Sequence, residues 1–263
     1  MKLSAFFCFV MLLLRRGAHW ASAAKQNGFA VKFSFRKCTI VQDGQWPPLR
    51  LYIVCSLNYY KPIFLKQGDE MNICIYGSAS NDISQNYIET TEELAKKLAK
   101  NGHSLVFGGG ANGLMGAAAR GFYSEGATIT GVVPKFFNVD GILFEHCNEM
   151  IRTDTMRQRK QKMDDLADAF ITTPGGIGTY EEFFEIITLK QLGQSNKPLV
   201  LFNIDGYFEP LRAMLENCVK GNFMPQHTID LCFFCDSIDG IIEYIENYKP
   251  VDFNILEYRN IKQ

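Results

Sequence analysis

The chain has 263 residues, of which 47% are hydrophobic and 21% charged, so it is long enough to bury a sizeable core in one domain. Its net charge is −1, but residues 1–70 carry ten Lys or Arg and three acidic residues, whereas residues 71–263 carry 17 basic and 25 acidic residues. An acidic main region excludes the broad positive face of a nucleic-acid-binding protein. A bound anion is therefore expected to be small and held locally.

Residues 1–70 show no persistent helical or strand period, which predicts a leader, a disordered arm or an over-long start of the chain. Leu3–Leu14 is an apolar run of 12 residues, too short to cross a membrane but long enough for the hydrophobic part of a signal peptide at 1–23. Arg15 and Arg16 follow this run and give it the reverse of the usual polarity, which disfavours secretion. Dispersed cysteines also favour a reducing compartment, so we expect a cytoplasmic protein with no membrane association.

From Met71 onward, short apolar strands alternate with amphipathic helices as far as Tyr248. In the segment 86–100, for example, Leu94 and Leu98 recur at helical spacing, with charged residues on the other side. The predicted strands are Asn72–Tyr76, Ser104–Phe107, Thr128–Val133, Glu149–Ile151, Ala169–Thr172 and Pro198–Phe202. The predicted helices are 86–100, 114–123, 156–167, 207–220, 238–248 and one that carries Phe183, Phe184 and Ile187.

This alternation predicts an α/β fold with a parallel sheet covered by helices on both faces. We expect a single domain at 71–250, followed by a tail at 251–263. Three glycine-bearing loops, at Gly77, Gly108–Gly116 and Gly175–Gly178, follow predicted strands. Because ligands of such sheets bind at the carboxyl ends of the strands, the three loops should converge on one crevice.

The loop from Thr173 to Glu182 is the most informative segment of the sequence. Its glycines lie at a strand-to-helix junction, where they let the backbone come close to a ligand. The following helix adds four unpaired N–H groups and the positive end of its dipole. This combination predicts a cradle for an anion, most plausibly a phosphate.

The loop Gly108–Gly113 fits the dinucleotide pattern G-x-G-x-x-G, but its context argues against NAD. It follows the second strand, and the next strand ends in Val133-Pro134-Lys135, with no acid for a ribose hydroxyl. Its glycines could equally serve tight turns and close helix–sheet contact. A metal site is not expected either, because Cys232-Phe-Phe-Cys235 lacks a second ligand pair and is typical of buried packing.

Two charged features near the phosphate cradle each allow two interpretations. Thr179 and Glu182 have the spacing of a capping box, but Glu182 could instead be a catalytic carboxylate. The basic residues of the helix at 156–167 could form a solvated face, or an arginine there could face the same ligand as Glu182. The second interpretation gains support from cap residues at 153–155, which place the first turn of this helix at a strand carboxyl end.

Five ordered motifs resemble those of the Lonely guy family of cytokinin riboside 5′-monophosphate phosphoribohydrolases, which are often mislabelled as lysine decarboxylases. The resemblance spans about Met71 to Tyr248 and none of 1–70. It rests on Gly77-Ser-Ala-Ser80, Gly108-Gly-Gly-Ala-Asn-Gly-Leu-Met-Gly116, Gly131-Val-Val-Pro-Lys135, Met156-Arg-Gln-Arg-Lys160 and Pro174-Gly-Gly-x-Gly-Thr-x-x-Glu182, with Gln191-Leu-Gly193, Lys197-Pro198 and Asn203-x-Asp-Gly-Tyr207 following. The departures are small: Ser78-Ala79-Ser80 is less serine-rich than usual, and Arg157 replaces a frequent His.

The resemblance implies a Rossmann-like, doubly wound fold, a homodimer and no metal or other cofactor. It also implies hydrolysis of the N-glycosidic bond of AMP or of an N6-substituted AMP, with release of base and ribose 5-phosphate. The alternative is a non-catalytic carrier of a nucleotide or of molybdenum cofactor. By the resemblance, Arg159 and Glu182 form the catalytic pair. The implied substrate-binding residues are Ser78, Gly109, Gly110, Met156, Lys160, Gly175, Gly176, Gly178 and Thr179.

Overall fold

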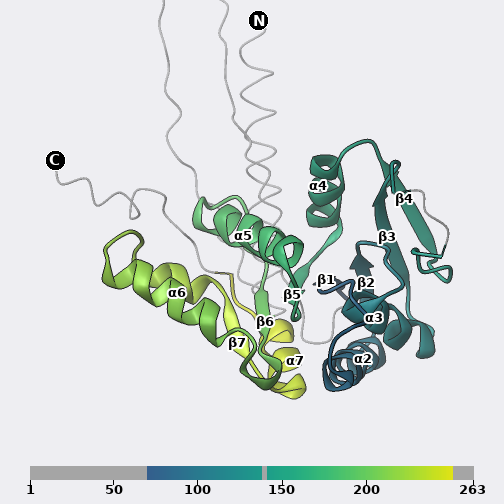
Figure 1. The fold of residues 1–263 in the computed structure, drawn as a ribbon, viewed down its shortest axis with the longest axis horizontal. Helices are drawn as coiled ribbons and strands as arrows, with labels where there is room; N and C mark the ends of the chain where they lie inside the picture. Colours follow the sequence, from purple (N-terminus) through teal and green to yellow (C-terminus); the bar gives the residue numbers. More distant parts are fainter. Residues whose placement is uncertain (1–69, 138–140, 251–263) are drawn as a thin grey trace, which may run out of the picture. The chain divides into compact units, whose positions relative to one another are not determined.

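The computed structural model describes residues 70–137 and 141–250 (Figure 1). Residues 1–69 of the predicted leader at 1–70, which include the candidate signal peptide, and the predicted tail at 251–263 lie outside the described residues. Within the described ranges, none of the helices is long and apolar enough to cross a membrane. The five cysteines described there are all free thiols.

Seven parallel strands form one sheet in the order β4-β3-β2-β1-β5-β6-β7. This confirms the predicted parallel α/β sheet. The chain places β2 to β4 on one side of β1 and β5 to β7 on the other, so the order reverses between β1 and β5. The strands are β1 (Asn72–Tyr76), β2 (Ser104–Phe107), β3 (Ile129–Pro134), β4 (Glu149–Thr153), β5 (Ala169–Thr172), β6 (Leu199–Phe202) and β7 (Phe233–Cys235).

Helices cover both faces of this sheet (Figure 1). One face packs against α2 (Gln85–Lys100), α3 (Gly113–Ser124) and α7 (Ile238–Glu246). The other face packs against α4 (Met156–Leu166), α5 (Ile177–Gln191) and α6 (Glu209–Lys220). The fold is therefore the doubly wound, Rossmann-like arrangement, and ligands of such folds bind where the strand order reverses.

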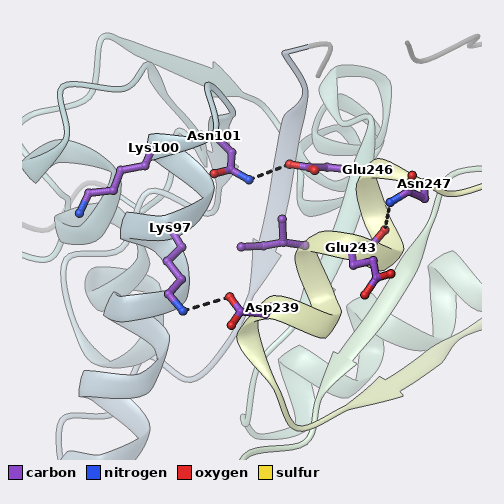
Figure 2. Close-up of a pocket in the computed structure, with 8 residues that line it drawn as sticks. Lys97, Lys100, Asn101, Asp239, Glu243, Glu246 and Asn247 are labelled. Atoms are coloured by element: carbon purple, nitrogen blue, oxygen red, sulfur yellow. Dashed lines mark hydrogen bonds and ion pairs between the residues drawn. The ribbon is translucent and has the colours of Figure 1, made fainter. Parts of the chain in front are cut away.

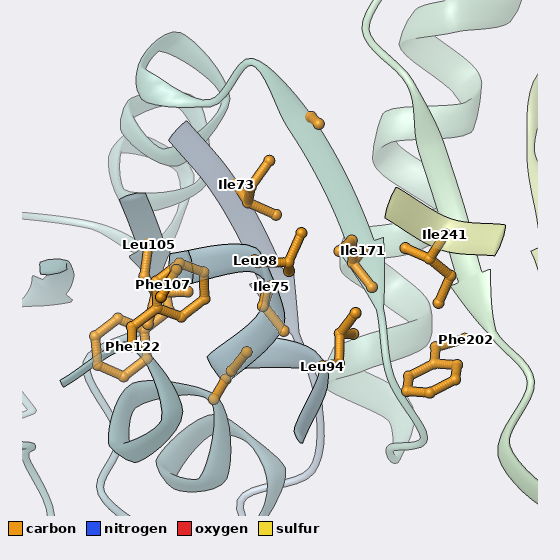
Figure 3. Packing of buried hydrophobic residues seen from close by; sticks show 14 of the residues in the cluster. Ile73, Ile75, Leu94, Leu98, Leu105, Phe107, Phe122, Ile171, Phe202 and Ile241 are labelled. Atoms are coloured by element: carbon orange, nitrogen blue, oxygen red, sulfur yellow. The ribbon is translucent and has the colours of Figure 1, made fainter. Parts of the chain in front are cut away.

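Alternating side chains of each strand supply the two cores. In β1, Ile73 and Ile75 point into the core shared with α2 and α3, whereas Cys74 and Tyr76 point into the core shared with α4 and α5. Figure 3 shows the first core, where Leu94 from α2 lies among strand residues. Because both faces are covered, the strands other than the partly exposed β4 and β7 are largely apolar, and this is why they stand out in the sequence.

Strand β7 is not among the strands predicted from the sequence, where the Cys232–Cys235 segment indicates only buried packing. Cys232 is indeed buried, but residues 233–235 also pair with β6, with Phe234 opposite Leu201. Three residues are too few to show a strand period, so only the neighbouring strand reveals this one. It forms the edge of the sheet on the β6 side.

Candidate active site

Hydrogen bonds tie the three glycine-bearing loops together at the carboxyl edge of the sheet. Ser78 N–H donates to Pro174 C=O (3.0 Å) and joins the loop after β1 to the loop after β5. Leu114 N–H donates to Ser78 C=O at 2.8 Å. Gly113 N–H donates to Asn81 Oδ1, also at 2.8 Å, so the loop after β2 joins the same group. The predicted convergence of the three loops is confirmed.

Helix α5 begins at the loop after β5, at the same edge of the sheet. Its first helical hydrogen bond runs from Tyr180 N–H to Gly176 C=O (3.1 Å), so the N–H groups of residues 176–179 have no partner within the helix. A Cβ on Gly176 or Gly178 would meet no atom within 4 Å, and neither glycine has a positive φ. Nothing in the described chain requires glycine at these two positions. They leave room at the positive end of the helix, as a bound phosphate needs.

The capping-box interpretation of Glu182 is wrong. It required Thr179 to be the N-cap, but the N-cap of α5 is Gly176 and Thr179 lies inside the first turn. The Thr179 side chain is buried against Gly175, where an added Cβ would lie 2.1 Å from Oγ1. Glu182 is therefore in the second turn, too far along the helix to cap its start, and it is free for another partner.

Helix α4 places its first turn at the same edge, as predicted from the cap residues. Thr155 is the N-cap: its Oγ1 accepts a hydrogen bond from Gln158 N–H (3.2 Å), and Gln158 Oε1 accepts one from Thr155 N–H (3.2 Å). Four residues beyond this cap, Arg159 is only 8% exposed. The solvated-face interpretation is therefore wrong for Arg159, although it holds for the exposed Arg157.

Arg159 and Glu182 form a buried ion pair between α4 and α5. Arg159 Nη1 donates to Glu182 Oε1 at 2.9 Å, and Arg159 Nε donates to the Val132 carbonyl of β3 at 3.1 Å. Gly108 allows this position, because a Cβ there would lie 2.0 Å from Arg159 Nη2. The guanidinium is thus fixed on three sides before any substrate arrives.

The surroundings of the pair favour uncharged groups. Burial raises the pKa of the Glu182 carboxyl above its ordinary value, although the positive charge of Arg159 acts in the opposite direction. Cys74 and Tyr76 on β1 are almost fully buried, and burial raises the pKa of both the thiol and the phenol. Glu182 and Arg159 therefore face each other in a poorly solvated environment, where electrostatic interactions are stronger than in water.

Lys160, which was predicted to bind substrate, reaches across to α5. Its ammonium group pairs with Glu181 and with Glu185 (2.7 Å to Oε2), and its side chain is 14% exposed. Burial lowers the pKa of Lys160, but the hydrogen bonds that its ammonium group donates to the two carboxylates outweigh this effect, so the net shift is upward. The side chain that follows Arg159 thus makes a second link between the helices that carry the pair.

The other predicted substrate-binding residues lie in the glycine loops and at the start of α4. Ser78 joins the loops through its backbone, and Met156 is exposed at the start of α4. Gly109 has a φ of +78°, and a Cβ there would lie 2.5 Å from Val133 Cγ2, so the packing of the chain itself requires this glycine. Gly110 pairs with Leu143 in an isolated bridge. Contact of these residues with substrate stays a prediction.

Three contributors to the site were not singled out from the sequence. Gly108 was noted only as part of the glycine motif, and Val132 acts through its backbone carbonyl, which no residue type announces. Tyr207 donates its hydroxyl hydrogen to the Gly175 carbonyl (2.7 Å) from a turn after β6. In the sequence, the only signal for Tyr207 is the Asn203-x-Asp-Gly-Tyr207 motif, which by itself indicates no role for the tyrosine.

Two surface grooves lie apart from this pair. Figure 2 shows one of about 360 Å³ between α2 and α7. Its polar groups bind one another, since Lys97 Nζ pairs with Asp239 (3.1 Å) and Asn101 donates to Glu246 (2.8 Å). The second, of about 510 Å³, runs along β4 and α4 and does not include Arg159 or Glu182. Neither groove is lined by Arg159 or Glu182, so the candidate active site rests on this pair and not on either groove.

The fold and the site together define a Rossmann-like α/β protein with a buried arginine–glutamate pair where the strand order reverses. The family model described as possible lysine decarboxylase matches residues 115–245. Cytokinin riboside 5′-monophosphate phosphoribohydrolase LOG2 of Arabidopsis thaliana is 34% identical over 178 residues, which is 68% of this chain and 84% of the relative. The probable enzyme LOG6 of the same plant is 38% identical over 179 residues, covering 68% and 89% of the two chains. This chain belongs to the Lonely guy (LOG) family of phosphoribohydrolases.

Solved structures share the fold at lower identity. The molybdenum cofactor carrier protein of Chlamydomonas reinhardtii has a TM-score of 0.51 at 22% identity, covering 68% of this chain and 97% of the carrier. The molybdenum cofactor binding protein of Rippkaea orientalis has a TM-score of 0.53 at 19% identity, covering 68% and 96%. These similarities establish the arrangement of strands and helices and carry no information on ligands.

Proposed function

We propose that this protein hydrolyses the N-glycosidic bond of AMP or of N6-substituted cytokinin riboside 5′-monophosphates, releasing the free base and ribose 5-phosphate. The observation that carries the proposal is the buried Arg159–Glu182 pair, one helical turn beyond the open N-terminus of α5. Gly178 and Glu182 are four residues apart and so lie on the same face of the helix. A phosphate at the helix start would place the attached sugar beside the carboxylate.

Each group has a distinct task in this reaction. The C1′–N9 bond breaks, a bond forms from C1′ to a water oxygen, and a proton from that water ends on the base. The ribose passes through an oxocarbenium-like state, which the Glu182 carboxylate stabilises while it orients a ribose hydroxyl or the water. The departing purine gathers negative charge, which the fixed Arg159 guanidinium offsets.

The phosphate lies away from the bond that breaks and supplies binding energy. We propose that Gly175, Gly176, Gly178 and Thr179 hold it, so that the sugar is positioned between the two charged side chains. A nucleoside without the phosphate should therefore react poorly. Release of base from AMP, isopentenyl-AMP and adenosine, measured side by side, tests both the reaction and this order of preference. Purified protein that releases base from neither nucleotide contradicts the proposal.

Substitution of Glu182 separates catalysis from folding. Glu182→Gln keeps the size of the side chain but removes its charge, and it should lower kcat by about 10²–10⁴-fold. Glu92→Gln is a matched control, because Glu92 also forms ion pairs, with Lys96 (2.8 Å) and Arg120 (3.2 Å), on the opposite face of the sheet. This control should leave kcat unchanged. Equal losses in the two variants would show that Glu182 has no catalytic task.

The oligomeric state belongs to the same proposal. We propose a homodimer with each site near the subunit interface, which sedimentation velocity of the purified protein tests.

The alternative function, a carrier of a nucleotide or of molybdenum cofactor, would use the glycine loops but would not need Arg159 paired with Glu182. Tight binding of AMP without any base release would favour that alternative.

We further propose that the catalytic domain begins at Met71 and that the protein works in the cytoplasm. Mass spectrometry of the N-terminus of the native protein tests the first point. Abundant peptides from 1–70 in the mature protein would contradict it. Fluorescence microscopy of the tagged full-length chain tests the second.

A further inference from the structure

Tyr207 contacts the proposed phosphate loop from a different part of the chain. It lies at the end of a short 3-10 turn, Ile204–Gly206, that follows β6. Its ring is half-buried, and its hydroxyl donates to the Gly175 carbonyl at 2.7 Å. The proposed reaction gives this residue no task so far, although it belongs to the Asn203–Tyr207 motif.

The hydrogen bond fixes the orientation of one peptide group. In a trans peptide, the carbonyl of Gly175 and the N–H of Gly176 point in opposite directions. Because Tyr207 holds that carbonyl on one side, the Gly176 N–H must point to the other. The preceding peptide is fixed in the same way, since Ser78 N–H holds the Pro174 carbonyl at 3.0 Å and so directs the Gly175 N–H away from itself.

Rigid contacts hold Tyr207 where this bond requires it. Asn203 Oδ1 accepts a hydrogen bond from Phe208 N–H (2.7 Å) and so closes the turn around Tyr207. Asp205 has a positive φ of 52°, and its carboxylate accepts a hydrogen bond from Asn86 of α2 at 2.7 Å. The Tyr207 ring also packs edge-to-face against Tyr87, with 6.0 Å between ring centroids. A side chain held this firmly loses little freedom when it orients the loop.

The geometry points to Tyr207 as a positioning residue that presets the phosphate-binding amides of the 175–176 loop. This inference rests on the proposed phosphate site and adds a residue to it. The inference requires no contact between Tyr207 and the phosphate. It acts through the Gly175 carbonyl, and without its hydroxyl the Gly175–Gly176 peptide can rotate and lose one aligned N–H donor. Glycine on both sides of this peptide makes such rotation easy.

Tyr207→Phe in the full-length protein tests the inference, because it removes the hydroxyl and keeps the ring. The affinity for ribose 5-phosphate, measured by calorimetry, should fall by about tenfold, the effect of one lost hydrogen bond. With AMP as substrate, KM should rise by a similar factor while kcat changes by less than about threefold. Tyr87→Phe is the matched control: it removes a hydroxyl from the neighbouring ring and should leave ribose 5-phosphate affinity unchanged.

Calorimetry separates this inference from the proposed function. If the wild-type protein binds ribose 5-phosphate but releases no base, the proposed reaction fails, and the effect of Tyr207→Phe on binding still decides the role of Tyr207. Unchanged affinity in Tyr207→Phe overturns the inference. A wild-type protein that binds no ribose 5-phosphate overturns it as well. Equal weakening in Tyr87→Phe would show that the rings merely support the fold, which also overturns it.

Discussion

The two main glycine loops of this protein look alike in sequence but differ in what requires their glycines. In the loop after β2, a Cβ on Gly108 would lie 2.0 Å from Arg159 Nη2, and Gly109 combines a φ of +78° with a Cβ position 2.5 Å from Val133 Cγ2. In the loop after β5, Gly176 and Gly178 would meet nothing within 4 Å. The first loop needs its glycines because the side chains of Arg159 and Val133 pack directly against its backbone.

In the second loop, packing against Thr179 requires glycine at Gly175, but Gly176 and Gly178 need a reason outside the described chain. Glycine in a helix costs stability relative to alanine, so Gly178, inside α5, is a locally unfavourable choice. A ligand that approaches the backbone closely accounts for that choice. The difference suggests a general test for glycine-rich loops: glycines that the protein does not need for itself mark where a ligand lies.

Alanine at Gly109 should produce the largest change in stability. The left-handed backbone and the contact with Val133 together should lower the free energy of unfolding by about 2–5 kcal/mol. Chemical denaturation of Gly109→Ala measures this loss. Gly126→Ala is a control with a similar φ of +72° but no atom within 4 Å of the added Cβ, so it should show only the smaller backbone contribution. Equal losses in both would mean that packing against Val133 is unimportant.

Alanine at Gly178 should have the opposite effect on stability and a separate effect on binding. Because the position is helical and open, Gly178→Ala should raise the free energy of unfolding by up to about 1 kcal/mol. The same methyl group would occupy the space proposed for the phosphate, so KM for AMP should rise by about tenfold or more, which corresponds to about 1.4 kcal/mol. Denaturation and steady-state kinetics on one preparation measure both effects. A variant that is more stable and binds AMP normally would contradict the comparison.

The sequence was a good guide to the regular elements of this fold and a weaker guide to the contacts within the site. Five of the six longer strands are found because burial on both faces makes them largely apolar. The fourth strand along the chain, β4, is partly exposed, and the three residues of β7 carry no period. Arg159 and Glu182 were recognised as partners, but the start of α5 was misplaced, because Thr179 resembles an N-cap more closely than Gly176 does. The Val132 carbonyl and the peptide orientation set by Tyr207 depend on tertiary geometry, which residue types do not encode.

Glu182 also separates what serves the fold from what serves a ligand, because the protonated form favours folding whereas the proposed reaction needs the ionised form. Burial raises the pKa of this carboxyl in the folded protein above the value of about 4.3 that a glutamate has in an unfolded chain. Between these two pKa values the native state binds more protons than the unfolded state, so the contribution of Glu182 to the free energy of unfolding falls as pH rises through this window. The proposed reaction needs the ionised form, so kcat/KM should rise over the same window.

Measuring melting temperature and kcat/KM from about pH 4 to about pH 7 shows whether the two trends oppose each other. Other carboxylates also make stability depend on pH. Burial alone would raise the pKa of Glu92, but hydrogen bonds from Lys96 and Arg120 outweigh it and lower this pKa, so the contribution of Glu92 to stability is lost as pH falls. Subtracting the melting-temperature profile of Glu182→Gln, which cannot titrate at this position, isolates the contribution of Glu182 to stability. If this difference in melting temperature rises with pH, the attraction of Arg159 outweighs the effect of burial on the pKa of Glu182. Glu182 would then stabilise the fold in the same form that the reaction uses, and the distinction between the two kinds of residue would not extend to this side chain.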